Sequence, residues 1–208
     1  ANGLKSFKSE ENAYNFKFDI GEGFKSSIPV QYNGFITDYS KLGYKYSGKL
    51  EVLEQIINEY LGEEIRSKNG AYDSGISIGK ENIYAYSYRD PELAKTYEIY
   101  KNIPEYIESL KLTDSKLQGY IISAYRAINP LLSSIDTNDG YLNHTLNGTS
   151  PDKNRIIEEL LSTSAKDIND FSQMLRDVID NWATATIGNS STIEKNADLF
   201  KYIKNYLD

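Results

Sequence analysis

Hydrophobic residues recur along the chain with two spacings, one typical of helices and the other of strands. Over residues 47–68 they recur every three or four positions, which predicts a helix with one apolar face. Residues 71–79 and 82–89 alternate instead, and the GKEN segment that joins them has the composition of a turn. The shared face of the helix comprises Leu50, Leu53, Ile57, Tyr60 and Leu61.

The two alternating segments predict a β-hairpin whose faces differ. One face carries aliphatic side chains and packs against other elements, whereas the other carries tyrosines and is wet or lines a cavity. Packing on the sheet is the more ordinary interpretation of the tyrosine stripe, and peptide binding is the alternative. The aliphatic positions are Ile76, Ile78, Ile83 and Ala85, and the tyrosine positions are Tyr84, Tyr86 and Tyr88.

Capping residues indicate where further helices begin. Asp90 and Pro91 have the types expected at a helix N-cap and first position, and Pro104 is expected to kink or end that helix. Four more helices are expected, over residues 112–128 (capped by Thr113 or Asp114), 150–164 (capped by Ser150), 164–182 and 192–207 (capped by Ser190 or Ser191).

The remaining segments complete a fold prediction. Residues 28–36 predict a strand in which Gly34 marks a bulge or a close approach, and residues 183–188 predict a short strand. Because helices do not separate the strands one by one, the order predicts an α+β fold with a mixed or antiparallel sheet and helices packed on one face. Residues 1–15 are expected to be a flexible segment or an expression remnant, and residues 16–208 a single domain.

Charge and residue counts exclude several kinds of function. The net charge of −7 argues against nucleic acid and anionic membrane surfaces as partners, because both attract an excess of Lys and Arg. The absence of cysteine excludes disulfides, thiolate metal sites and a cysteine nucleophile. No apolar run approaches the roughly 18 residues of a membrane helix, and no secretory signal is expected, which favours a cytoplasmic location.

The single histidine, His144, limits catalysis further. Zinc peptidases with an H-E-x-x-H or H-x-x-E-H motif need two histidines on one helix face, which this chain cannot supply. No G-x-S-x-G segment accompanies His144 as the base of a triad, so we expect a loop or helix-edge residue there. We therefore expect no metal site in this chain, and a stand-alone enzyme is the least supported interpretation.

Four segments together resemble the C-terminal domain of pitrilysin/insulysin-type zinc metallopeptidases, and the presequence-protease-like branch in particular. The central segment runs from RSKNGAYDSG through the hairpin to SYRDPELAKTYEIY and is the most specific. The others are EGFKSSIPVQYNG, LNGTSPDKNRIIEELLSTSAKDI and ATATIGNSS. The similarity covers roughly residues 16 to 206 and departs from the family pattern at Asn69, where the family often has a second glycine.

The resemblance implies a metallopeptidase α/β-roll domain within a larger zinc metalloendopeptidase. Such enzymes have two halves that enclose a chamber in which unfolded peptides are degraded, and their zinc belongs to an N-terminal domain that this chain lacks. The implied partners are the N-terminal catalytic half of the same parent chain and an unfolded peptide substrate. This chain alone is then expected to bind no zinc and to be inactive.

By position, the resemblance implies that Arg66 and Tyr72 face the substrate across the chamber. Tyr72 would be an auxiliary catalytic residue that donates a hydrogen bond to the oxyanion, and Arg66 would bind the peptide main chain. Gly70 would allow the backbone to turn between them. Without the resemblance, Arg66 is a cation at a helix end and Tyr72 is half-buried packing. The alternative function is a peptide-binding or scaffold module with no catalytic contribution.

Overall fold

The structure, a computed structural model, describes residues 22–26, 31–129 and 153–205 of the chain. The expectations for residues 1–15, for His144 and for the Ser150 cap lie outside these described residues. In the described ranges, no helix combines the length and the apolar character needed to cross a membrane.

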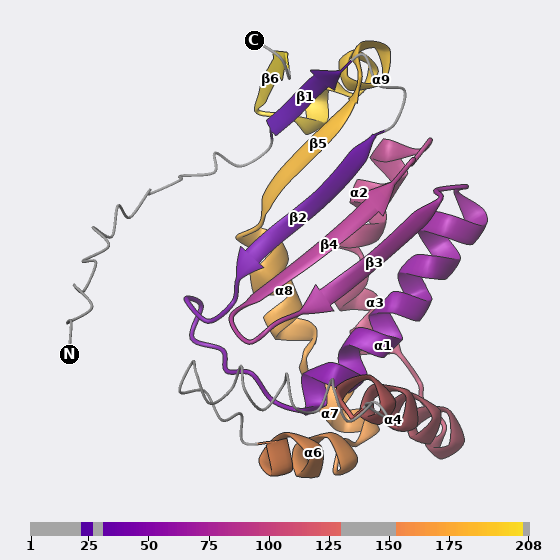
Figure 1. Ribbon diagram of the computed structural model, residues 1–208, viewed down its shortest axis with the longest axis vertical. Coiled ribbons are helices and arrows are strands. Elements are labelled where there is room, and N and C mark those ends of the chain that lie inside the picture. The colour runs from indigo at the N-terminus through magenta and orange to yellow at the C-terminus, as the bar shows by residue number, and fades with distance from the viewer. Residues whose placement is uncertain (1–21, 27–30, 130–152, 206–208) are drawn as a thin grey trace, which may run out of the picture.

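The strands form one sheet that is antiparallel at one end and parallel at the other (Figure 1). They are β1 (Glu22–Ser26), β2 (Tyr32–Asp38), β3 (Asp73–Ile78), β4 (Asn82–Tyr88), β5 (Ala183–Asn189) and β6 (Tyr202–Asn205). Their order across the sheet is β3-β4-β2-β5-β1-β6. The first four strands in this order are antiparallel neighbours, whereas β1 lies parallel to both β5 and β6.

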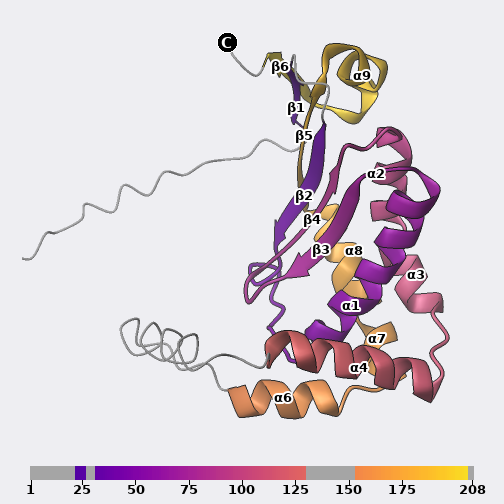
Figure 2. The ribbon, with the colours of Figure 1, turned by 45° about the vertical axis from the view of Figure 1, so that its right-hand side comes forward.

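Helices cover one face of this sheet. They are α1 (Lys49–Leu61), the π-helical η1 (Gly62–Lys68), α2 (Leu93–Lys101), α3 (Ile103–Ser109), α4 (Asp114–Ile128), α6 (Lys153–Leu161), α7 (Ala165–Asp170), α8 (Ser172–Asp180), α9 (Ser190–Lys195) and the short 3₁₀ turn η2 (Ala197–Leu199). Figure 2 shows α1, α2, α3 and α8 on the same side of the sheet, with α4, α6 and α7 gathered below one end. The predicted α+β fold with helices on one face is confirmed.

The alternation of the hairpin decides which face the helices cover. Ile76, Ala85 and Phe35 are neighbours across β3, β4 and β2, and each is at most 4% exposed. α1 packs on this apolar face with its own side chains, and Leu50, Leu53, Ile57 and Leu61 are fully buried, as predicted. Burial of an aliphatic side chain of this size contributes about 1.5–3 kcal/mol, so this layer supplies much of the core.

The outer edge of β3 is occupied by side chains of α1. Asn58 donates its amide N–H to the carbonyl of Ile76 at 3.0 Å and accepts the N–H of the same residue at 2.8 Å. Glu54 accepts the N–H of Ile78 at 2.6 Å. Because an edge strand would otherwise expose these backbone groups, α1 replaces the strand that is missing on that side.

Gly34 allows β2 and β4 to approach closely. A Cβ atom at this position would lie 2.5 Å from the carbonyl oxygen of Ala85, closer than real side chains come. The β2–β4 register is continuous, so the close-approach alternative is correct and the bulge alternative is wrong. The strand itself begins at Tyr32 and extends to Asp38, two residues beyond the predicted end.

Two predicted helices are interrupted. Pro104 lies in the first turn of α3, which follows α2 after Asn102, so the predicted break at this proline is confirmed. The helix predicted over 164–182 is divided at Phe171 into α7 and α8.

Thr113 is the N-cap of α4, which decides between Thr113 and Asp114, the two candidates that the sequence offered.

Asp167 links α7 to the start of α1. It completes a capping box with Ser164, and its carboxylate pairs with the Lys49 ammonium at 2.6 Å. Burial opposes ionisation of this group, but the hydrogen bonds from Lys49 and Ser164 outweigh it and lower its pKa to about 2.

The helix predicted over residues 192–207 is correct only as far as Lys195, and a helix over residues 202–205 is wrong. α9 ends at Lys195, and β6 follows as a strand beside β1. Asn189, rather than Ser190 or Ser191, caps α9 by accepting the N–H of Thr192 at 2.8 Å. Residues 202–205 gain backbone hydrogen bonds by completing the sheet, and the local spacing of a sequence cannot reveal a partner that is about 180 residues distant.

Candidate functional site

The predicted site lies where the chain turns from η1 into β3. Gly70 has a φ of +81°, a left-handed conformation that favours glycine, and its N–H donates to the carbonyl of Arg66 at 3.1 Å. A Cβ at Gly70 would meet only Pro91, at the ordinary contact distance of 3.7 Å. The glycine is therefore required by its backbone conformation and not by a lack of space. Asn69 keeps a negative φ of −101°, so the single glycine is sufficient for this turn.

Arg66 and Tyr72 flank this turn, and both side chains are exposed. Tyr72 is 64% exposed, although its N–H extends the hairpin by donating to the carbonyl of Tyr88 at 3.0 Å. In the described part of the chain, no hydrogen bond, ion pair or ring contact involves the Arg66 guanidinium. The turn therefore joins the two residues through the backbone, and among the described residues no hydrogen bond or cation–π contact links their side chains.

A different arginine lies over the Tyr72 ring. The Cζ atom of Arg89 is 5.4 Å from the ring centroid of Tyr72 and 5.3 Å from that of Tyr88. The two rings meet edge to face at 5.9 Å, and Tyr32 packs on Tyr88 at 4.6 Å. We call these four residues, Tyr32, Tyr72, Tyr88 and Arg89, the Tyr72 cluster.

The backbone conformation of Arg89 is unusual. Its φ is +49°, and it is the only described residue other than glycine with a positive φ. The next residue, Asp90, is 1% exposed, and its carboxyl group accepts hydrogen bonds from the Ser87 hydroxyl at 2.7 Å and the Thr96 hydroxyl at 2.5 Å. Asp90 also accepts the N–H of Glu92 at 2.9 Å.

These contacts correct the prediction for Asp90. The helix α2 begins at Leu93 and not at Pro91, and its N-cap is Glu92. Asp90 therefore closes the turn before the helix instead of being its N-cap. Its side chain is directed into the core, where two buried hydroxyls hold it, because a buried carboxyl group must have hydrogen-bond partners.

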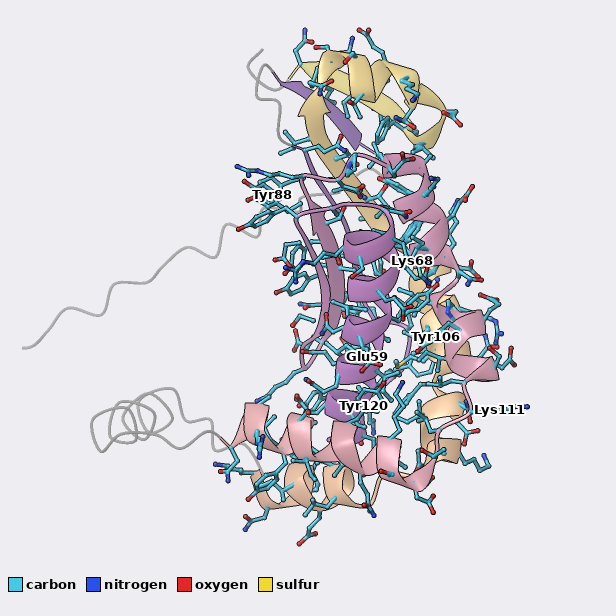
Figure 3. The ribbon with its side chains drawn as sticks, turned by 90° about the vertical axis from the view of Figure 1, so that its right-hand side faces the viewer. Glu59, Lys68, Tyr88, Tyr106, Lys111 and Tyr120 are labelled. Carbon is cyan, nitrogen blue, oxygen red and sulfur yellow. The ribbon has the colours of Figure 1, made fainter. Side chains whose placement is uncertain are left out.

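The Tyr72 cluster belongs to an open face of the sheet. Tyr88 projects from the side of the sheet opposite to the helices (Figure 3), and Tyr32 lies beside it in the β2–β4 register. Farther along the same face, Ile36 pairs with Tyr84, and both are more than 40% exposed. The tyrosine stripe thus packs on a sheet face that the described elements leave uncovered, as the hairpin pattern predicts.

Tyr86 connects the open face to β3. Its hydroxyl donates to the Asp73 carboxylate at 3.0 Å, and burial together with this hydrogen bond raises the pKa of Tyr86. Asp73 also accepts the N–H of Ser74 at 2.9 Å. The acidic group nearest to Tyr88 in the β3–β4 register is therefore engaged within the sheet.

Sequence reasoning named Arg66, Gly70 and Tyr72 but missed Arg89. The sequence did offer one indication of Arg89. It lies between the tyrosine-rich strand β4 and the start of α2, and a charged residue between a strand and a helix is expected at the rim of the sheet. In the described ranges, no group of three or more histidine and acidic side chains is arranged to hold a metal ion. The described acidic side chains therefore do not fit a zinc site.

Comparison with known proteins gives this geometry a context. The family model of the PreP C-terminal domain matches residues 26–189. The chain belongs to this family. The resemblance to a C-terminal domain of presequence-protease-like, insulinase-type peptidases is therefore confirmed, and the match includes the turn with Gly70, the hairpin and the Tyr72 cluster.

Similarity to individual proteins and to solved structures agrees with this assignment. Protein HypA of Clostridium perfringens is 32% identical over 202 residues, which are 95% of this chain and 21% of that protein. Presequence protease 1 of Arabidopsis thaliana is 29% identical over 173 residues, 80% of this chain and 16% of that protein. The crystal structure of pitrilysin shares the fold with a TM-score of 0.61 at 7% identity, over 89% of this chain and 21% of that chain. The chain thus spans about a fifth of the length of these relatives.

Proposed function

We propose that this chain is the non-catalytic C-terminal domain of a zinc metalloendopeptidase that degrades unfolded peptides in a closed chamber. Membership of the PreP C-terminal domain family supports the peptidase context. The observation that carries the proposal is the exposure of Tyr72, 64% at the rim of an uncovered sheet face, on the turn that also carries Arg66. A tyrosine with only a packing role would be covered to a larger extent.

Tyr72 acts in this proposal as an auxiliary hydrogen-bond donor. Peptide hydrolysis develops negative charge on the carbonyl oxygen of the scissile bond, and a neutral hydroxyl aimed at that oxygen stabilises it. Loss of one such donor lowers turnover by roughly 10²–10³ in well-studied enzymes. The Tyr72 hydroxyl suits this task because no described group engages it in a hydrogen bond.

Arg66 has a different role. Its planar guanidinium can donate two parallel hydrogen bonds to oxygens of the substrate main chain, which fixes the peptide beside the scissile bond. Gly70 sets the separation of the two residues through its left-handed turn. Both residues then act in trans, because zinc and its ligands are supplied by the N-terminal half of the parent protein. The chain alone is inactive in this proposal, and activity requires the two halves to close on the substrate.

The second candidate is a peptide-binding or scaffold module without a catalytic contribution. The uncovered apolar side chains of Tyr32, Ile36 and Tyr84 favour it, because exposed aromatic and aliphatic groups that gather on one face commonly bind a partner. In that case the tyrosine stripe holds the peptide, and the Tyr72 hydroxyl is dispensable.

The substitution Tyr72→Phe in the full-length protein separates the two candidates. We expect kcat on a fluorogenic peptide to fall by at least about 100-fold with KM changed less than about threefold, because the hydroxyl acts mainly in the transition state. Tyr84→Phe is the matched control, since it removes a hydroxyl from the same face and should keep kcat. If both variants turn over peptide at the wild-type rate, the scaffold function is correct and the oxyanion role is wrong.

A further inference from the structure

The Arg89 guanidinium lies against two aromatic rings and forms a compact triangle with them. Its distances to the Tyr72 and Tyr88 centroids are 5.4 and 5.3 Å, and the two rings are 5.9 Å apart at an interplanar angle of 89°. A guanidinium at these distances is attracted by the negative faces of the rings. The arrangement fixes a permanent positive charge beside the hydroxyl-bearing ring of the proposed site.

The surrounding backbone determines this placement. Asp90 is buried with its carboxyl group held by Ser87 and Thr96, whereas the guanidinium of the preceding residue lies against the rings of Tyr72 and Tyr88. Arg89 takes its positive φ at that point, and its N–H donates to the carbonyl of Gln31 at 3.0 Å. A non-glycine residue keeps such a conformation only when its surroundings enforce it, and such residues are concentrated at functional sites.

The charge of Arg89 is not neutralised by the described chain. No described acidic side chain lies within ion-pair distance of it, although the protein carries 30 acidic residues against 23 basic ones. Arg155 and Arg176, by contrast, pair with glutamates on their own or neighbouring helices. Asp73, near Tyr88 in the sheet, is occupied by Tyr86 and Ser74.

No group of the described residues accepts a hydrogen bond from the Arg89 guanidinium, so its N–H groups are available to a ligand. Five donors in a fixed fork match the two oxygens of a carboxylate. We infer that Arg89, held by Tyr72 and Tyr88, binds the carboxylate of an acidic side chain of the peptide substrate. This inference rests on the proposed function, and it makes Arg89 a determinant of substrate preference next to the scissile bond.

The test uses the full-length protein and pairs of fluorogenic peptides that differ only by Glu or Gln at one position near the cleaved bond. At one such position, we expect the wild type to cleave the Glu peptide with kcat/KM about tenfold higher, the factor typical of one charge-assisted hydrogen bond at an accessible site. Arg89→Asn should reduce this ratio to about one, because Asn tolerates the left-handed backbone but carries no charge. Arg89→Lys should keep the direction of the preference with a smaller ratio, because it loses the fork.

Two controls separate the inference from the proposed function. Arg126→Asn removes an exposed arginine on α4 and should leave the ratio unchanged. Tyr72→Phe should lower kcat for both peptides equally and keep the ratio. If Tyr72→Phe keeps wild-type kcat while Arg89→Asn abolishes the ratio, the oxyanion role fails and the carboxylate site stands.

The binding of the same labelled peptides, measured by fluorescence anisotropy, gives the same comparison without turnover. If the full-length protein cleaves no peptide but binds the Glu peptide more tightly through Arg89, the carboxylate site is supported and the proposed peptidase function is wrong. Absence of any Glu preference in the wild type, or a preference that survives Arg89→Asn, would overturn the inference.

Discussion

The buried carboxyl group of Asp90 is the most informative place to perturb this fold. Asp90→Ala removes the acceptor for two hydroxyl donors, Ser87 and Thr96, that have no exposed surface. The third donor, the N–H of Glu92, belongs to an exposed residue and can bond to water instead. The loss of stability should therefore come mainly from the two buried hydroxyls.

The magnitude follows from the number of donors left without a partner. A buried polar group that loses its partner costs about 1–3 kcal/mol, so two such groups predict a loss of about 2–6 kcal/mol. Relaxation of the hydroxyls toward each other favours the lower half of that range, and we expect about 3 kcal/mol. Because a domain is stable by about 5–15 kcal/mol, the variant should fold but should unfold at clearly lower denaturant concentration.

Urea unfolding followed by far-UV circular dichroism measures this loss. With a urea m-value of about 2 kcal/mol per molar, the midpoint should fall by roughly 1.5 M. Thr96→Val alone should cost about 1 kcal/mol. The double variant Asp90→Ala/Thr96→Val should be less destabilised than the sum of the two, because removal of both partners leaves no unsatisfied group at Thr96. A loss below about 1 kcal/mol for Asp90→Ala, or strict additivity in the cycle, would refute the reasoning.

Three further predictions concern other parts of the chain. Asp167→Asn should lower the free energy of unfolding by about 0.5–1 kcal/mol at pH 7. The folded-state pKa of Asp167, about 2, lies below the reference value of 3.8, so the stability from the carboxylate is present above pH 4 and disappears as the pH falls through 2. The urea midpoints of wild type and variant should therefore converge near pH 2. A difference between the midpoints that is constant with pH would contradict this. Gly34→Ala should cost at least about 2 kcal/mol, because its Cβ would meet the Ala85 carbonyl at 2.5 Å, and an unchanged melting temperature would show that β2 and β4 can move apart. The purified chain should retain no stoichiometric zinc by elemental analysis after dialysis, and one retained equivalent would place a zinc site in this chain.

Local sequence patterns were sufficient for the centre of the fold. The alternation around Ile76 and Ile83 predicted the hairpin, its turn and its packed face, because period-two patterning is strong when only one face is covered. The helical spacing from Leu50 to Leu61 predicted α1 for the same reason. The break at Pro104 followed from the missing backbone N–H of proline.

The parts that depend on distant partners could not be predicted in this way. β6 is exposed along its whole length, so its residues carry no alternation, and only pairing with β1 defines it as a strand. Arg89 was missed because its position results from the burial of Asp90 and from a backbone conformation that sequence does not display. The roles of Arg66, Gly70 and Tyr72, the division at residue 15 and the cytoplasmic location stay predictions.

The pairing of Asn58 with both backbone groups of Ile76 has a consequence for how a peptide can reach this domain. An extended chain cannot add to the sheet at β3, because α1 already occupies the hydrogen-bonding positions there. In the proposed function, a peptide bound at the Tyr72 cluster therefore lies across the tyrosines rather than alongside β3, held by side chains instead of by a backbone ladder. Such binding depends on shape and charge at a few positions and tolerates many sequences. The occupied edge of β3 also prevents other copies of the isolated domain from pairing with it edge to edge.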